Sequence, residues 1–189
     1  VESPALLSHG EVETLFHDMI AQARETIYVE SQYLACGNFA RILAEVMRRR
    51  PHLEAVLVCP RSYGGALERT VMLSGRGRVM RILRRAGVAS RVLVAAPRVQ
   101  HDGKRIDVSV HAKLMIIDDR YLRVGSANLC NRSMGTDTEC DLVVVAEEED
   151  AATRAAIIAW SKELDCLGAQ PADNRDANPP RTSHERAEH

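Results

Sequence analysis

The sequence lacks any strong excess of charge. Its 25 lysine and arginine residues nearly balance 26 aspartate and glutamate residues, which gives a formal net charge of −1. A chain with this balance has no overall field that would draw it to nucleic acid or to a membrane. Lysine itself is scarce, at positions 104, 113 and 162 only, so nearly all the positive charge is arginine. Such a bias often reflects genome composition, and Lys113 stands out against it.

Paired cysteines and long apolar segments are also missing. The five cysteines are odd in number and include no C-x-x-C pair, which indicates reduced thiols rather than a disulfide framework or a zinc site. No apolar run approaches the ~20 residues of a transmembrane helix, and no signal peptide is visible. We therefore expect a cytoplasmic or membrane-associated protein. The sequence starts at Val1 rather than Met, as a fragment of a longer protein would.

The remaining composition indicates an ordinary globular domain. The chain has 189 residues, of which 46% are hydrophobic, enough for one domain with its own core. Helical patterns alternate with short apolar runs typical of strands, which predicts an α/β domain with a mixed β-sheet flanked by helices on both faces. We place this domain at residues 1–168. Residues 169–189 are polar and proline-rich, and we expect a disordered tail there.

The expected elements follow from hydrophobic periodicity and from turn and cap residues. Helices are predicted over residues 12–23, from a cap at Asn38 to Pro51, within 66–86, and after Asp150. Strands are predicted over residues 26–34, 55–59, 92–96, 106–110, 113–117, 121–124 and 142–146. Residues 97–105 are predicted to form a loop, and residues 118–119 a turn between two strands.

The segment that carries chemical information is 110–139, VHAKLMIIDDRYLRVGSANLCNRSMGTDTE. Alternate residues of a strand share a face, which would place His111 and Lys113 side by side. Histidine supplies a nucleophile or a general acid near neutral pH, and lysine a fixed positive charge for a phosphate oxygen. Asp118 ends the same strand, where it either takes part in the chemistry or holds a turn.

A second group follows the next strand. Gly125 permits a tight turn, and the Ser126 hydroxyl and Asn128 amide can form hydrogen bonds with phosphate oxygens. Glu139 lies 28 residues after His111. Its carboxylate could return in space to hold the imidazole ring and set its tautomer.

Other charged and polar residues allow two interpretations. Glu30 and Gln32 share one face of the early strand, and either line the pocket or lie exposed at the strand end. The arginines at 76, 78, 81, 84 and 85 either meet anionic lipid or phosphate, or form a solvated helix face, which is the commoner case in an arginine-rich protein.

The spacing His-x-Lys-x₄-Asp followed by Gly-Ser-x-Asn resembles the HKD motif of the phospholipase D superfamily. NRSMG and TECD after it are similar to bacterial phospholipase D and cardiolipin synthase proteins. TIYVESQYL resembles the strand IYIENQYF near the start of the C-terminal half of bacterial two-motif phospholipases. The likeness spans residues 11–168. The residues that match the motif are His111, Lys113, Asp118, Gly125, Ser126 and Asn128.

This resemblance implies a phospholipase D-like α/β/α half and a metal-independent phosphodiesterase without a cofactor. Two HKD motifs meet at one site, where one histidine attacks phosphorus to form a phosphohistidine and the other protonates the leaving alcohol. The implied catalytic residues are His111, Lys113, Asp118, Asn128 and Glu139. The implied substrate-binding residues are Gly125, Ser126, Glu30 and Gln32.

The sequence departs from the two-motif pattern because it contains a single motif. The second half would come from a longer parent chain, which the resemblance to C-terminal halves favours, or from a homodimer partner. The implied substrate is a phospholipid, hydrolysed or transferred, with peripheral membrane contact. Two alternatives stay open: a dimeric HKD-type endonuclease acting on nucleic acid, and a catalytically silent half that binds phosphate. His111 would be the general acid in a two-motif chain and would take either role in a homodimer.

Overall fold

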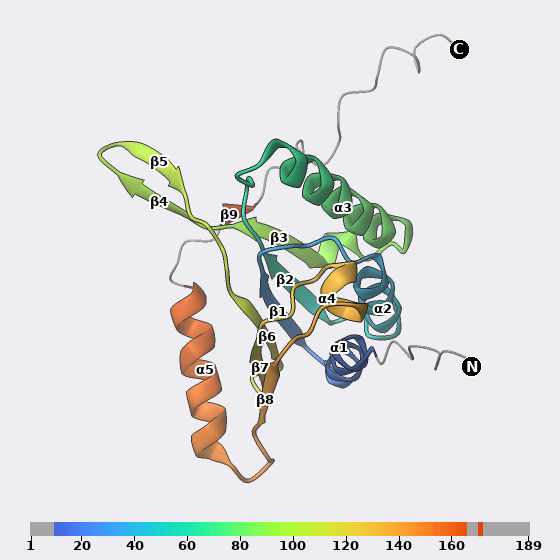
Figure 1. Cartoon of the computed structure of the whole chain (residues 1–189). Helices are drawn as coiled ribbons and strands as arrows, with labels where there is room; N and C mark the ends of the chain where they lie inside the picture. Colours follow the sequence, from blue (N-terminus) through green and yellow to red (C-terminus); the bar gives the residue numbers. More distant parts are fainter. Residues whose placement is uncertain (1–9, 166–169, 172–189) are drawn as a thin grey trace, which may run out of the picture.

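A computed structural model of the chain describes residues 10–165 and 170–171. They form a seven-stranded sheet in the order β8-β7-β6-β1-β2-β3-β9 and a separate hairpin, β4-β5 (Figure 1). β1, β2 and β3 run parallel, whereas the other neighbours in the sheet are antiparallel. The strands of the sheet are β1 (Thr26–Ser31), β2 (Glu54–Val58), β3 (Val92–Ala96), β6 (Lys113–Ile117), β7 (Tyr121–Gly125), β8 (Asp141–Val145) and β9 (Gln170–Pro171).

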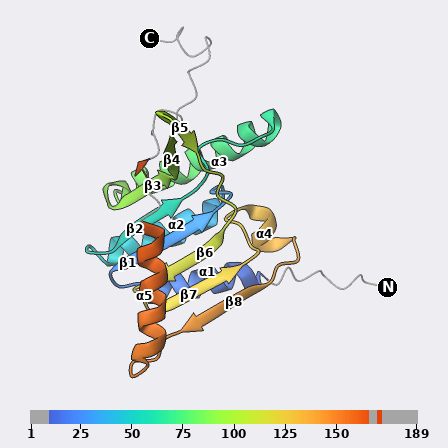
Figure 2. The same cartoon turned by 90° about the vertical axis from the view of Figure 1, so that its left-hand side faces the viewer.

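Helices cover both faces of this sheet, as predicted. Four α-helices lie on one face and α5 lies on the other (Figures 1 and 2). A short 3-10 turn, η1 (Ala89–Arg91), leads into β3. The α-helices are α1 (Glu11–Gln22), α2 (Gly37–Arg49), α3 (Ala66–Arg85), α4 (Asn131–Gly135) and α5 (Ala151–Asp165).

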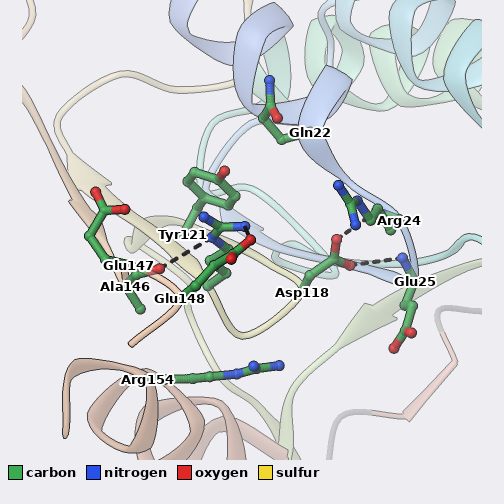
Figure 3. A pocket seen from close by; sticks show the side chains of 10 residues that line it. Gln22, Arg24, Glu25, Asp118, Tyr121, Ala146, Glu147, Glu148 and Arg154 are labelled. Carbon is green, nitrogen blue, oxygen red and sulfur yellow. Dashed lines mark hydrogen bonds and ion pairs between the residues drawn. The ribbon is translucent and has the colours of Figure 1, made fainter. Parts of the chain in front are cut away.

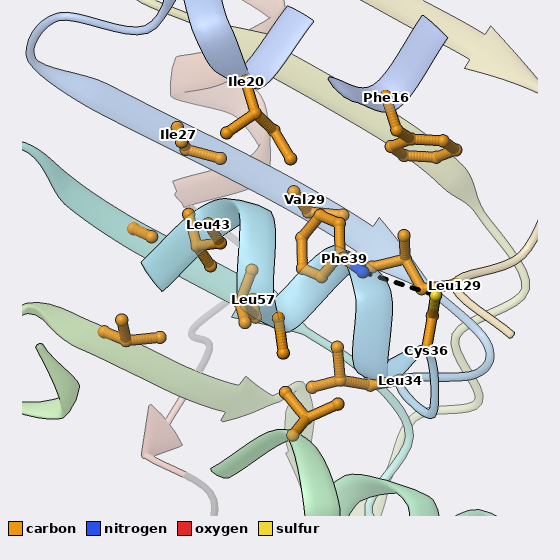
Figure 4. Packing of buried hydrophobic residues seen from close by; sticks show 14 of the residues in the cluster. Phe16, Ile20, Ile27, Val29, Leu34, Cys36, Phe39, Leu43, Leu57 and Leu129 are labelled. Carbon is orange, nitrogen blue, oxygen red and sulfur yellow. Dashed lines mark hydrogen bonds between the residues drawn. The ribbon is translucent and has the colours of Figure 1, made fainter. Parts of the chain in front are cut away.

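The main core lies between the sheet and helices α1–α4. Phe16 and Phe39 meet edge to face, with ring centroids 6.2 Å apart, over the apolar side chains of β1 (Figure 4). β6 is buried along its whole length and divides its side chains between the two faces. Met115 and Ile117 join the main core, whereas Leu114 and Ile116 pack with Ile157 of α5. This two-sided burial explains why β6 reads as a continuous apolar run.

The strand register brings the motif residues other than Asp118 to one edge of the sheet. The start of β6 pairs with the end of β1, so that Lys113 lies opposite Ser31. The end of β7 pairs with the start of β8, which places Gly125 opposite Asp141. The ends of β1 and β7 and the starts of β6 and β8 therefore lie at the same edge.

The prediction of a loop over residues 97–105 is wrong. This segment contains most of an antiparallel hairpin of β4 (Arg98–His101) and β5 (Lys104–Asp107). Asp102 and Gly103, with φ of 50° and 71°, make its turn. The hairpin lies largely in solvent, with Val99 opposite Ile106, so it has no buried face to give the sequence a period of two. The predicted strand 106–110 accordingly ends at Asp107.

The N-terminal cap of α2 also differs from the prediction. Cys36, not Asn38, is the cap residue, and its sulfur accepts the Phe39 N–H at 3.4 Å. The Asn38 amide instead donates to Glu13 and accepts from Arg41. The predicted turn at Asp118-Asp119 is present, with φ of 51° and 52°.

Three expectations bear on the chain's ends and environment. The predicted tail from residue 169 lies outside the described residues except for Gln170–Pro171, which pair with β3. The four described cysteines are free thiols, and Cys166 lies outside the described residues. None of the described helices has the length and apolar character required to span a bilayer.

Candidate active site

Lys113 is the buried cation of the predicted motif. As the first residue of β6 it is 8% exposed, and its Nζ donates to the His111 carbonyl oxygen at 2.7 Å and to Gln32 Oε1 at 3.3 Å. Burial lowers the pKa of its ammonium group, and the nearby Glu139 carboxylate acts in the opposite direction. Both hydrogen-bond acceptors are neutral oxygens, so the positive charge of Lys113 remains available for an anion.

His111 lies two residues before β6, in an exposed segment rather than inside a strand. Strand alternation therefore does not orient its side chain, and the contact between His111 and Lys113 is made by the His111 backbone carbonyl oxygen. His111 lines a cavity of about 340 Å³ that also contains Tyr28 and Glu30. Glu30 is 8% exposed and accepts a hydrogen bond from the Tyr28 hydroxyl at 2.6 Å. A buried carboxylate thus faces the same cavity as the imidazole.

A buried ion pair that was not predicted from the sequence stabilises the Gly125–Asn128 turn. Arg123 Nη2 donates to Asp141 Oδ1 at 2.5 Å and to the Ala127 carbonyl oxygen at 3.1 Å. The Arg123 guanidinium also lies 4.4 Å from the centroid of the Phe16 ring. A Cβ at position 125 would come within 1.7 Å of Asp141 Oδ1, which explains the glycine. The signal in the sequence is the arginine inside the strand YLRVG.

Ser126 and Glu139 contact each other directly. The Ser126 hydroxyl donates to Glu139 Oε2 at 2.5 Å and accepts the Cys140 N–H at 2.9 Å. Between the described residues His111 and Glu139 there is no hydrogen bond, so the predicted imidazole–carboxylate contact is not formed in this structure. Glu139 instead acts on the pKa of Lys113 through its charge.

Asn128 has an unsatisfied polar atom. Its Oδ1 is buried and has no hydrogen-bond partner among the described residues. The next residue is held firmly, because the Leu129 N–H donates to Ser31 Oγ at 3.1 Å and Ser31 Oγ donates to the Tyr33 carbonyl oxygen. A buried polar atom without a partner costs free energy, so Asn128 Oδ1 can accept a hydrogen bond from a bound donor such as water.

Asn128 and Glu139 line a second cavity of about 450 Å³, between α3 and the start of α4. This cavity shares no lining residue with the one that contains His111 and Glu30. Lys113 interacts with residues of both cavities, because its Nζ donates to the His111 carbonyl oxygen and the Glu139 charge raises its pKa. The structure therefore brings the predicted residues other than Asp118 to one edge of the sheet, but it divides His111 and Glu30 from Asn128 and Glu139 between two cavities.

Asp118 lies at the opposite end of β6 from Lys113, about 16 Å away for five residues of extended strand. Its carboxylate accepts three backbone N–H groups, those of Arg24, Glu25 and Thr26, at 2.6–2.8 Å. Figure 3 shows the bonds from Arg24 and Glu25. These bonds fasten the β6–β7 turn to the start of β1. Of the two interpretations given for this residue, its contacts match the structural one.

Metal ligation finds no support in the described part of the chain. Among residues 10–165 and 170–171, no group of three or more His, Cys, Asp and Glu side chains lies close enough together to hold an ion. The expectation of a metal-independent reaction stays a prediction, which a chelation experiment can test.

The sequence matches a known family over most of its length. A family model described as cardiolipin synthase, PLD-like domain, matches residues 16–159. Phospholipase D A of Dictyostelium discoideum is 24% identical over 174 residues, with 74% of this chain and 14% of its own length covered. Phospholipase D alpha 3 of Arabidopsis thaliana is 50% identical over 40 residues, which is 20% of this chain and 5% of its own length. The chain thus spans a small part of these curated relatives.

Solved structures share the fold at low sequence identity. The phospholipase D family member Nuc from Salmonella typhimurium aligns with a TM-score of 0.55 and 14% identity, over 84% of this chain and 88% of its own. NucT from Helicobacter pylori gives 0.54 and 16%, over 88% and 94%. Phosphatidylserine synthase of Haemophilus influenzae Rd KW20 gives 0.60 and 14%, over 85% of this chain but 37% of its own. The same fold therefore occurs both as a whole short chain and as part of a longer one.

Proposed function

Because the chain belongs to the phospholipase D superfamily, as a cardiolipin synthase-type, phospholipase D-like domain, we propose that it supplies one half of the active site of a metal-independent phospholipid phosphodiesterase. The proposed reaction is hydrolysis of a phospholipid or transfer of its phosphatidyl group. The other half of the site comes from a second HKD motif.

The observation that carries this proposal is the state of Lys113. It is a buried ammonium group whose hydrogen-bond acceptors, His111 O and Gln32 Oε1, carry no charge. Removing a cation from water is costly unless an anion compensates for it. Burial lowers the pKa of Lys113, and the Glu139 carboxylate offsets only part of this effect. A phosphodiester bound beside His111 would supply the compensating negative charge and would add hydrogen-bond acceptors for Lys113.

In the proposed mechanism, a histidine nitrogen attacks phosphorus while the leaving alkoxide takes a proton from the second histidine. Water or an acceptor alcohol then attacks the phosphohistidine after giving its proton to the second histidine, and the first histidine leaves as a free imidazole. Lys113 and Asn128 stabilise the charge that grows on the phosphoryl oxygens. In-line displacement places the attacking and leaving atoms on opposite sides of phosphorus, so His111 cannot fill both roles.

Glu139 is proposed to orient the His111 ring once substrate and the second half are present. Catalytic hydrogen bonds are often long or absent in a free enzyme and form in the complex. The Ser126 hydroxyl would hold Glu139 at the site until then, because it already donates to Oε2. In this proposal Ser126 acts through Glu139, because its single hydroxyl proton is donated to that carboxylate and not to a phosphate oxygen.

Two architectures can supply the second motif. The coverage of only 37% of the phosphatidylserine synthase structure supports a half within a longer chain. The coverage of 88% and 94% of Nuc and NucT supports a short chain that pairs with its own copy, which is the architecture of the endonuclease alternative. We favour a lipid substrate because the family model that matches is the cardiolipin synthase type.

A substrate panel tests this proposal. The chain, with its second half present, is assayed on mixed micelles of phosphatidylglycerol and on single-stranded DNA, with His111→Ala as the matched inactive control. We expect release of the headgroup or exchange with added alcohol, lost in His111→Ala, and no DNA cleavage. DNA cleavage without lipid turnover would favour the endonuclease alternative over the lipid proposal. If His111→Ala kept the activity of the unmodified chain, His111 would not be part of the active site.

A further inference from the structure

Helices α2 and α3 concentrate positive charge in a chain that is nearly neutral. Within their bounds lie nine arginines and two glutamates, whereas the whole chain has a net charge of −1. The two helices pack against each other on the outside of the sheet, opposite α5 (Figures 1 and 2). The rest of the chain is therefore acidic, and the positive charge is collected on one helical layer.

A single exposed stripe runs along α3. Its members are spaced by three and four residues, so they share one side of the helix, and every one is exposed. The stripe begins with apolar side chains, Leu67 at 79% exposure and Val71 at 49%, and ends with arginines. It spans about 27 Å at 1.5 Å per residue. The members of this stripe are Leu67, Val71, Ser74, Arg78, Arg81 and Arg85.

Arginines of α2 extend the stripe sideways. Arg41, Arg48 and Arg49 are exposed and line a groove between α2 and α3. Among these and the stripe arginines, in the described part of the chain, only Arg49 forms an ion pair with a carboxylate, that of Glu45. Within residues 10–165 and 170–171, the other guanidinium groups have no carboxylate partner, and this arrangement would attract an external anionic surface.

The middle of the stripe borders part of the candidate active site. Val71, Ser74 and Arg78 line the same cavity as Asn128 and Glu139. An object that lies along α3 would therefore reach the hollow that holds two of the proposed site residues. The stripe is therefore continuous with the cavity that Asn128 and Glu139 line.

We propose that this stripe, with the α2 arginines, is the surface through which the protein docks on an anionic phospholipid bilayer. The arginines match the negative headgroups, and Leu67 and Val71 match the apolar layer beneath them. A nucleic-acid backbone would use the arginines but would leave the most exposed leucine of the helix without a partner. The choice of lipid rests on the proposed function, because docking would present phospholipid to the Asn128 cavity.

Vesicle binding tests the docking surface separately from catalysis. The His111→Ala chain is mixed with vesicles of phosphatidylcholine alone or of phosphatidylcholine with phosphatidylglycerol, and the bound fraction is measured by sedimentation. We expect binding to the anionic vesicles only, weakened by salt. The pair Arg81→Ala and Arg85→Ala should weaken it about 30-fold, at roughly tenfold per 1.4 kcal/mol and about 1 kcal/mol for each arginine.

Arg24→Ala with Arg154→Ala is the matched control. Both arginines are exposed, and they line a different cavity, where Asp118 ends β6 (Figure 3). Leu67→Trp gives a second readout, since its added fluorescence should shift to shorter wavelength on anionic vesicles. Equal binding to both vesicle types, equal loss in the control pair, or arginine-dependent binding of an oligonucleotide without vesicle binding would each overturn the proposal. Absence of lipid turnover with normal vesicle binding would instead count against the proposed function alone.

Discussion

Replacing Asp141 by alanine should destabilise the fold far more than removal of an exposed carboxylate. The Asp141 side chain is 5% exposed and its partner Arg123 is 1% exposed, with 2.5 Å between Oδ1 and Nη2. Without Asp141 the guanidinium would remain buried and uncompensated, because its other contacts are the Ala127 carbonyl oxygen and the Phe16 ring. Breaking one side of a buried pair costs about 3–5 kcal/mol, a large share of the ~5–15 kcal/mol that stabilises a domain.

Urea unfolding measures this cost. With a slope of about 2 kcal/mol per molar urea, Asp141→Ala should lower the midpoint by roughly 1.5–2.5 M. Asp137→Ala is the matched control, since its partner Arg132 is 80% exposed and Asp137 is 33% exposed. That exposed pair should contribute at most about 1 kcal/mol. Adding Arg123→Met to Asp141→Ala should restore part of the loss, since no buried charge remains. Equal shifts for the Asp141 and Asp137 variants would refute the reasoning.

Three further predictions concern the chemistry of the site. Glu139→Gln should leave the urea midpoint nearly unchanged but lower turnover by a factor of ten or more, on the order of the loss expected when an imidazole partner is removed; unchanged turnover would contradict its proposed role. Burial lowers the pKa of Lys113 from its ordinary 10.5, so the folded protein loses this proton at a lower pH than the unfolded chain. Below the lowered pKa, the buried ammonium group is charged and destabilises the fold. As pH increases from the lowered pKa towards 10.5, the folded protein loses this proton, so the free energy of unfolding should rise while turnover falls. A Lys113→Arg variant should show neither change in urea midpoints and pH–rate profiles. Finally, turnover should survive EDTA, whereas complete loss restored by zinc or magnesium would indicate a metal-dependent mechanism.

The elements that could be predicted are those whose buried residues form a recognisable apolar pattern in the sequence. β3 and β6 match the predicted 92–96 and 113–117 because apolar residues fill these strands. The β4–β5 hairpin was missed because it buries too little to impose alternation, and its Asp-Gly turn at 102–103 was the only local signal. The cap of α2 was missed because cysteine is an uncommon cap, whereas asparagine is a favoured one.

The sequence predicted which residues belong to one site but not where on the sheet that site lies. The strand register brings Lys113 and Gly125 to the edge where β1 and β7 end. The spacing of the residues could not show that the Ser126 hydroxyl donates a hydrogen bond to Glu139. It also could not show that Asp118 accepts three backbone N–H groups at the far end of β6. It also did not reveal the buried Arg123–Asp141 pair, because a charge inside a strand shows its partner only after the strands are paired.

The central claim is that one motif supplies only half of a catalytic site. The direct measurement is turnover of a generic soluble phosphodiester as a function of protein concentration, alone and with an added second half, with the oligomeric state followed by light scattering. We expect no turnover by the monomer, and we expect turnover only when a second motif faces His111, from an upstream half or from a paired copy. Robust turnover by a verified monomer, abolished by His111→Ala, would contradict it.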